Sequence, residues 1–374
     1  MEEKEKKEKE ETVVIAPVEE EKKSHKKRAI LLLLLLLITG FLLTTSTYAW
    51  FTSNTTVSVN NIQVNVATQN GIQLSVDGIN WKSILSTTDL QGAYNTYGAA
   101  TNQLPTTLEP VSTALNIEND YLKMFYGVVD TNTNGDYILT ATDVSTVLDN
   151  HNTVEGTAGG ATGKFVMFDL FFKLDGDTGK DTNIYMTSSS GIKAEGNDTG
   201  IKNASRVAFI NLGKLTSDKT STEVQAITGG TDKYLWEPNY DAHTATGVNN
   251  AVQVYKMSAD SIKAGTDNNI VAYDGINSTI SSDENVKLGE ANTKHENAGS
   301  KFTTVTPAYT TKESFSATGS QETQQIFDLT AGYITKVRVY FWVEGQDVDC
   351  ENGASGGGIV LNLQFTTNAP ATGE

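Results

Sequence analysis

The segment DTNTNGDYILTATD, residues 130–143, has the residue types of a calcium-binding loop. Side chains with oxygen atoms stand at alternate positions around a glycine, at Asp130, Asn132, Asn134 and Asp136. In an EF-hand loop such alternate oxygens ligate calcium, the glycine makes a sharp turn, and a glutamate at the twelfth position closes the site. The segment is therefore a candidate calcium site.

The spacing of this segment departs from the calcium loop at its end. The twelfth position is Ala141, and the next carboxylate, Asp143, comes two residues later. A β-hairpin is the alternative, because KMFYGVV and DYILTA have strand-forming sequences and an Asn/Gly-rich turn joins them. We favour the hairpin, and a calcium ion bound at its turn is compatible with both interpretations.

Other groupings of reactive residues fall short of a catalytic site. The segment WEPNYDAH brings together Glu237, Asp241 and His243, which could ligate a metal, but we favour a loop anchored by its tryptophan. The HENAG segment at His295 lacks the second histidine of a zinc protease. The sequence contains neither a G-x-S-x-G nucleophile motif nor a phosphate-binding glycine loop. We therefore expect a protein that is not an enzyme and needs no cofactor.

The only cysteine, Cys350, lies in an acidic loop with Asp347, Asp349 and Glu351. A single cysteine cannot form a disulfide within the chain, so stability must come from packing. We expect Cys350 to be buried as a small apolar residue and the acidic side chains to be solvated.

An apolar run spans residues 29–43, interrupted only by Thr39 and Gly40. A basic cluster ending at Arg28 precedes it, and Thr47-Tyr48-Ala49 follows with the small residues that a signal peptidase needs. We favour cleavage between Ala49 and Trp50 by an export signal peptidase. The alternative is a retained membrane anchor, in which the aromatic residues at 48, 50 and 51 extend the apolar run. On either interpretation the rest of the chain faces outward.

The leader and the exported part of the chain also differ in net charge. Residues 1–28 carry nine basic residues and nine glutamates, and residues 29–49 carry no charge, so the net charge of −17 belongs to the exported part. Such an acidic surface disfavours nucleic acid and anionic lipid. Any contact with a membrane is expected only through an uncleaved signal segment.

Short apolar runs among many Thr, Ser, Asn and Gly residues predict an all-β fold. Apolar residues alternate over 57–66 with a slip in phase at Asn60-Asn61, which indicates a bulge or tight turn. Asp77-Gly78 predicts a two-residue hairpin, and residues 165–174 predict a central strand buried on both faces. Further strands are expected at 184–186, 206–212, 336–344 and 359–366, and weaker ones at 252–255 and 270–273. A loop joins the strands at 336–344 and 359–366 into a terminal hairpin, and together with residues 57–81 they are expected to close the same sheets.

The predicted organisation has four parts. A charged, disordered leader covers residues 1–28, and a hydrophobic signal segment covers 29–49. One secreted β domain follows over 50–367, with polar insertions at about 82–160 and 214–330, and a flexible tail covers 368–374. A short helix is expected within the first insertion.

The basic leader, the segment TTSTYAWFTSN, the strands that follow it and the late segment VYFWVEGQDVDC resemble secreted Gram-positive proteins of the TasA/camelysin group, exported with a SipW-type signal peptide. The resemblance covers residues 28–80 and 336–366. It implies a jelly-roll β-sandwich and self-association into extracellular matrix or cell-surface fibres. In such fibres the segment freed by signal cleavage inserts as a strand into the next subunit.

On this sequence that role falls on residues from Trp50 to about Val66. The apolar residues of this donated strand are Phe51, Val57, Val59, Ile62 and Val64. Such a strand satisfies its backbone groups along an open sheet edge, while alternate side chains enter a groove. Two alternatives remain: a secreted or membrane-anchored adhesin that binds through its loops, and a camelysin-like hydrolase.

Overall fold

The computed structural model describes two separate units, Met1–Thr45 and Ser46–Glu374. In the first unit, Ile30 and Leu32–Leu34 are helical. In the second, the described residues are 56–67, 71–111, 113, 117–131, 137–143, 162–174, 181–187, 189–236, 244–246, 325–345, 347, 349–350 and 354–367, together with four two-residue strands between 275 and 312. No helix in the described parts is long and apolar enough to cross a membrane.

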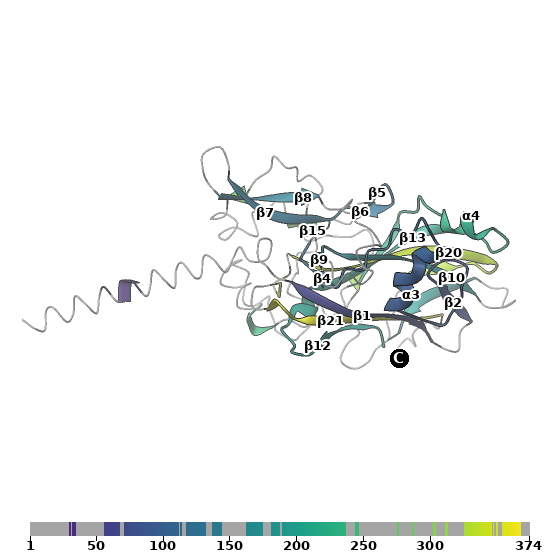
Figure 1. The fold of residues 1–374 in the computed structure, drawn as a ribbon, viewed down its shortest axis with the longest axis horizontal. Coiled ribbons are helices and arrows are strands. Elements are labelled where there is room, and N and C mark those ends of the chain that lie inside the picture. The colour runs from purple at the N-terminus through teal and green to yellow at the C-terminus, as the bar shows by residue number, and fades with distance from the viewer. Residues whose placement is uncertain are drawn as a thin grey trace, which may run out of the picture. The chain divides into compact units, whose positions relative to one another are not determined.

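The second unit is all-β, and two large sheets contain most of its strands (Figure 1). Sheet 1 has the order β19-β11-β21-β1-β4-β9, with β12 paired to β21 and β3 paired to β1. Its strands are β1 (Val57–Val66), β3 (Ile84–Ser86), β4 (Thr107–Leu108), β9 (Thr162–Gly163), β11 (Thr182–Met186), β12 (Gly191–Glu195), β19 (Phe327–Leu329) and β21 (Gly358–Thr366).

Sheet 2 has the order β18-β14-β13-β20-β10-β2. Its strands are β2 (Ile72–Ser75), β10 (Val166–Leu174), β13 (Ser205–Thr216), β14 (Asp232–Trp236), β18 (Thr311–Lys312) and β20 (Tyr333–Val343). The predicted central strand is confirmed as β10, which lies between β20 and β2 and is almost entirely buried.

Smaller elements complete the described fold. Three minor sheets join β5 (Ile117–Glu118) to β6 (Tyr121–Leu122), β7 (Phe125–Thr131) to β8 (Tyr137–Asp143) and β16 (Val286–Lys287), and β15 (Gly275–Ile276) to β17 (Phe302–Thr303). The helices are α3 (Thr87–Gln91), α4 (Ser221–Gln225), η1 (Gly92–Asn95) and η3 (Ile201–Ala204). The predicted short helix is confirmed as α3, which Ser86 and Asp89 begin with a capping box.

One apolar core joins sheets 1 and 2, because inward side chains of β1 and β21 share it with those of β10, β13 and β20. Phe365 of β21 illustrates the contact between the sheets. Its ring centroid lies 5.2 Å from that of Phe172 on β10 and 5.9 Å from that of Phe209 on β13, both in edge-to-face geometry. The core therefore depends on packing, as expected for a chain with one cysteine.

The last two long strands, β20 and β21, lie in different sheets. β20 pairs with β10 and β13, whereas β21 pairs with β1, β11 and β12. The expectation that VYFWVEGQDVDC begins a terminal hairpin is therefore wrong. The expectation that the two ends of the domain share sheets is confirmed, because β1 lies beside β21 (Figure 1).

The hairpin predicted at Asp77-Gly78 is also wrong. Strand β2 ends at Ser75, and residues 76–80 form bends held by the buried Asp77 carboxylate. That carboxylate accepts hydrogen bonds from the backbone N–H groups of Ile79 and Asn80, both at 2.8 Å. The side chain thus binds the N–H groups that a returning strand would have used. Only one bridge, between Leu74 and Lys82, joins the two arms.

Candidate functional site

Strand β1 is the first described strand after the predicted cleavage point, and it lies inside sheet 1. It pairs in parallel with β21 over most of its length, and on its other edge it pairs antiparallel with β4 and β3. The side chains of Val57, Val59, Ile62 and Val64 are at most 7% exposed and belong to the core. Four of the five predicted donor residues therefore pack within their own subunit, and donating them would require β1 to leave its own sheet.

The predicted irregularity at Asn60-Asn61 is confirmed as a bulge within β1. The register against β21 shifts between Val59 and Asn61, so the apolar residues on both sides of the shift face the same core. In a regular strand without the bulge, Ile62 and Val64 would face the opposite side from Val59, because Ile62 is three residues after Val59. The bulge thus explains how one ten-residue strand buries both of its apolar runs.

The chain enters β1 beside the loop that precedes β21. The Thr56 N–H lies 3.3 Å from the Ser355 side-chain oxygen, and the Gly356 N–H donates to the Thr56 carbonyl at 2.8 Å. Ala49, Trp50 and Phe51, on which the predicted cleavage and the start of the donor segment depend, lie outside the described residues. The segment that cleavage would release therefore joins the domain at the N-terminal end of β1.

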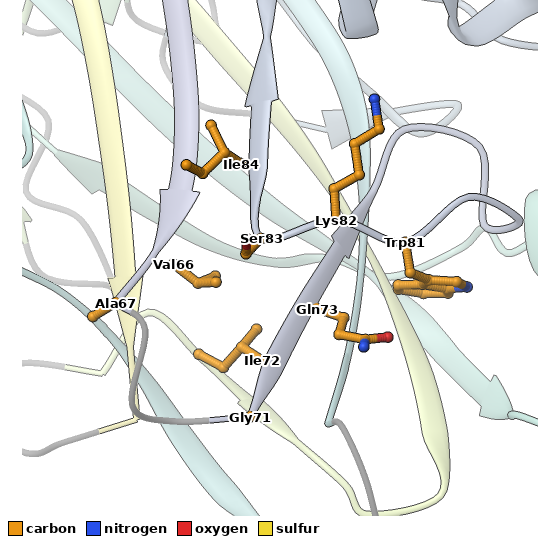
Figure 2. A pocket seen from close by; sticks show the side chains of 9 residues that line it. All are labelled: Val66, Ala67, Gly71, Ile72, Gln73, Trp81, Lys82, Ser83 and Ile84. Atoms are coloured by element: carbon orange, nitrogen blue, oxygen red, sulfur yellow. The ribbon is translucent and has the colours of Figure 1, made fainter.

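A hollow of about 620 Å³ lies at the opposite, C-terminal end of β1. Its walls come from three segments, and the lining residues are Val66, Ala67, Gly71, Ile72, Gln73, Trp81, Lys82, Ser83 and Ile84. Figure 2 shows Val66 and Ile72 on neighbouring walls, while Gln73 points toward Trp81 and Lys82 extends away from the centre. Hollows of this size take small ligands or a few side chains.

Charged groups at the rim of the hollow are paired. Lys82 forms a salt bridge with Asp89, and the Lys173 ammonium lies 4.3 Å from the ring centroid of Trp81. Burial alone would raise the pKa of Asp89, but hydrogen bonds from Lys82 and Ser86 outweigh it and hold the pKa below its usual value. The lining of the hollow therefore combines apolar side chains with the polar groups of Gln73 and Ser83, and its one charged residue is paired.

A second group of ionisable side chains is buried on the far face of sheet 2. Lys336 donates to the Tyr97 hydroxyl at 2.9 Å and to the backbone carbonyls of Gln225 and Ile227 at 2.8 and 3.1 Å. Its ammonium also lies 3.3 Å from the Asp169 carboxylate. Since neighbouring protein groups take up the donors of Lys336, this cluster is arranged to hold elements together.

Electrostatics in this cluster follow from burial and pairing. Burial lowers the pKa of Lys336 and raises that of Tyr97. Burial alone would raise the pKa of Asp169, but Arg338 and Lys336 outweigh it and lower that pKa. Asp169, Lys336 and Arg338 were not among the residues predicted to form a site. The sequence feature that could have indicated them is a charged residue within each of the apolar runs VMFDLFFKL and KVRVYFW.

The prediction that the acidic side chains near Cys350 are solvated is wrong for Asp347 and Asp349, which are both 1% exposed, and Glu351 lies outside the described residues. Asp347 forms a salt bridge of 2.6 Å with the buried Arg206, and Asp349 accepts hydrogen bonds from the N–H and hydroxyl of Thr244. These carboxylates are buried because they have protein donors. Cys350 is buried, as predicted.

The hairpin favoured for residues 130–143 is present in the structure. Strands β7 and β8 pair antiparallel in continuous register, with Asp130 opposite Ile138 and Thr131 opposite Tyr137. The calcium candidates Asn132, Asn134 and Asp136 lie outside the described residues, so calcium at the turn stays a prediction. The described residues contain no group of three or more His, Cys, Asp or Glu arranged to hold a metal ion.

Comparison of the chain with protein-family models, curated proteins and solved structures found no match.

Proposed function

We propose that this chain is a secreted structural subunit of an extracellular matrix or cell-surface fibre, joined to its neighbour through the segment that signal cleavage releases. The position of β1 carries the proposal. Because this strand is fixed inside its own sheet, residues 50–55 are joined to the domain at the start of a fixed strand. The sequence resemblance to the TasA/camelysin group points the same way.

The strand order supports a jelly roll. The eight main strands, in chain order, are β1, β10, β11, β13, β14, β19, β20 and β21. Numbered from one to eight, they lie in the order 1-8-3-6 in sheet 1 and 2-7-4-5 in sheet 2. Two Greek keys folded into two sheets give this order. The one departure is that β1 runs parallel to β21.

The position of β1 limits which residues the chain can donate to a neighbouring subunit. Residues 57–66 contribute core side chains and pair on both edges, so removing them would open the domain. The donated segment is then the six residues before Thr56, with Trp50 and Phe51 as its large apolar side chains. Burying two such side chains in a neighbour contributes about 3–6 kcal/mol before the cost of ordering the segment.

Electron microscopy of the exported protein tests this proposal directly. We expect fibres of repeating globules from the chain that begins at Trp50, and only monomers after deletion of residues 50–55. The deletion leaves β1 intact, so an unchanged melting temperature controls for folding. Fibres that persist after the deletion, or monomers from the undeleted chain, would contradict the proposal.

One observation favours an adhesin as a second candidate. The β7–β8 hairpin belongs to neither large sheet and pairs instead with β16 from the polar middle of the chain. Hairpins carried on a rigid scaffold often bind partners. An adhesin would bind cells or matrix as a monomer and would lose binding when residues 125–143 are replaced by a short linker, whereas a fibre subunit would still assemble.

A further inference from the structure

In the described part of the β domain, the exposed large apolar side chains lie on one short segment. They are Ile79 and Ile84, which are 45% and 54% exposed. Both lie on the segment 79–84, which also contributes Trp81, Lys82, Ser83 and Ile84 to the hollow. Scattered single exposures are ordinary, but a concentration beside a hollow marks an interaction site.

The chemistry of the hollow selects an uncharged ligand with large apolar groups. Val66, Ala67, Ile72 and Ile84 give it apolar walls, and Gln73 supplies an amide. The one charged residue that lines it, Lys82, is paired with Asp89. An anion or a cation would therefore find no free partner there, whereas an aromatic side chain would gain contact on several sides.

We propose that this hollow binds the segment Trp50–Thr55 of a second copy of the chain. The proposal rests on the proposed function, and it adds the receiving site. The segment has the required chemistry, because it begins with Trp50 and Phe51 and contains no charged side chain. Its polar residues, Thr52, Ser53, Asn54 and Thr55, can exchange hydrogen bonds with Gln73 and Ser83 at the rim.

Chain length excludes the subunit's own segment. From Val57 to Ala67 the strand covers about 33 Å. The residues from Trp50 to Val57 reach about 25 Å when fully extended, and the edges of β1 along that path are already paired with β21, β4 and β3. The segment therefore cannot fill the hollow of its own subunit.

The proposed contact between subunits joins two different surfaces, so it runs from head to tail. The segment is attached to the domain at one end of β1, and the hollow lies at the other end of the same strand. An interface made from two different surfaces continues from copy to copy unless rotation closes a ring. Placing its halves at opposite ends of one rigid strand favours an open filament.

Photo-crosslinking tests the site. Phe51 is replaced with p-benzoylphenylalanine in the exported chain, fibres are grown and irradiated, and crosslinked peptides are mapped by mass spectrometry. We expect crosslinks between subunits to residues 66–84. Crosslinks confined to other regions, or none in a sample with fibres, would overturn the proposal.

A substitution at the hollow separates this inference from the proposed function. Ile84→Asp places a charge in the apolar wall at an exposed position, so it should reduce fibre yield about tenfold or more without lowering the melting temperature. Val360→Asp, on a partly exposed position of β21, is the matched control and should leave the yield unchanged. If wild-type protein forms fibres and Ile84→Asp does too, the hollow is not the receiving site. If wild-type protein forms none, the proposed function itself fails.

Discussion

Arg338 on β20 and Asp169 on β10 form a two-point ion pair inside the protein. The Arg338 Nε and Nη2 atoms lie 2.8 and 3.1 Å from the two carboxylate oxygens of Asp169. Arg338 also donates to the Asp120 carbonyl and to the Thr101 hydroxyl, which belong to segments outside the sheet. The pair therefore ties the surrounding loops to the centre of sheet 2.

Asp169→Ala should destabilise the protein strongly. The substitution leaves Arg338 and Lys336 buried without their shared carboxylate, and breaking a buried pair from one side costs about 3–5 kcal/mol. Chemical denaturation of wild type and variant measures the free energy of unfolding. The control is the double variant Asp169→Leu with Arg338→Met, which removes both charges of the pair and should recover part of the loss. Equal stability of wild type and Asp169→Ala would contradict this account.

Asp77 should make the protein sensitive to acid. Burial alone would raise its pKa, but hydrogen bonds from Thr96, Asn80, Ser75 and Ile79 outweigh it and lower the pKa to about 2. Because the folded pKa is below the unfolded value, the carboxylate stabilises the fold above about pH 4, and this contribution is lost as the pH falls toward 2. Its size is about 2 kcal/mol.

The test compares Asp77→Asn with wild type in denaturation experiments across this pH range. The difference in free energy of unfolding should be near its full value at pH 6 and should shrink between pH 4 and pH 2. Asp232→Asn removes an exposed carboxylate and controls for the change in net charge. A difference that stays constant with pH would mean that ionisation of the Asp77 carboxyl does not stabilise the fold.

Phe365→Ala should weaken the contact between the two sheets. The Phe365 side chain is fully buried and its ring touches those of Phe172, Phe209 and Phe327. Replacing such a phenylalanine with alanine costs about 3–5 kcal/mol, because apolar contact is lost and a cavity remains. Thermal unfolding measures the loss, and the milder Phe365→Leu should give a smaller one. A loss below about 1 kcal/mol for alanine would mean that residues other than Phe365 hold the two sheets together.

Cysteines can report whether β1 pairs within its own subunit. Gln63 and Asn362 are neighbours across β1 and β21, and adjacent strands are about 4.8 Å apart, which suits a disulfide. Gln63→Cys with Asn362→Cys should give an oxidised monomer. A mixture of the two single variants should give no mixed dimer on a non-reducing gel. A mixed dimer would mean that β1 itself is exchanged between subunits.

Strands with a clear apolar pattern were predictable from the sequence. β1 and β21 alternate between apolar and polar residues around one buried face, whereas β10 and β20 are apolar over most of their length, which is typical of strands buried on both faces. The loop that replaces the predicted hairpin at Asp77 was not predictable, because the same Asp-Gly pair suits both a two-residue turn and a loop organised by the aspartate side chain. Which one forms depends on Thr96, nineteen residues away, whose hydroxyl donates to Asp77.

The buried charges and the hollow could not be derived from local sequence. Asp169, Lys336 and Arg338 stand on neighbouring strands only because β10 pairs with β20 across more than 150 residues of chain. The hollow likewise needs the end of β1, the start of β2 and the approach to β3 to meet. Strand pairing over such distances is set by the whole fold. The local sequence therefore shows which residue types are present but not which residues they contact.

The central claim is that proteolysis after Ala49 turns residues 50–55 into a free connector ahead of a fixed β1. Mass spectrometry of the exported protein tests this claim most directly, because it measures the first residue of the chain. The account predicts a mature N-terminus at Trp50. An exported chain that still carries residues 1–49 would contradict it, because the connector would then be tethered to the signal segment.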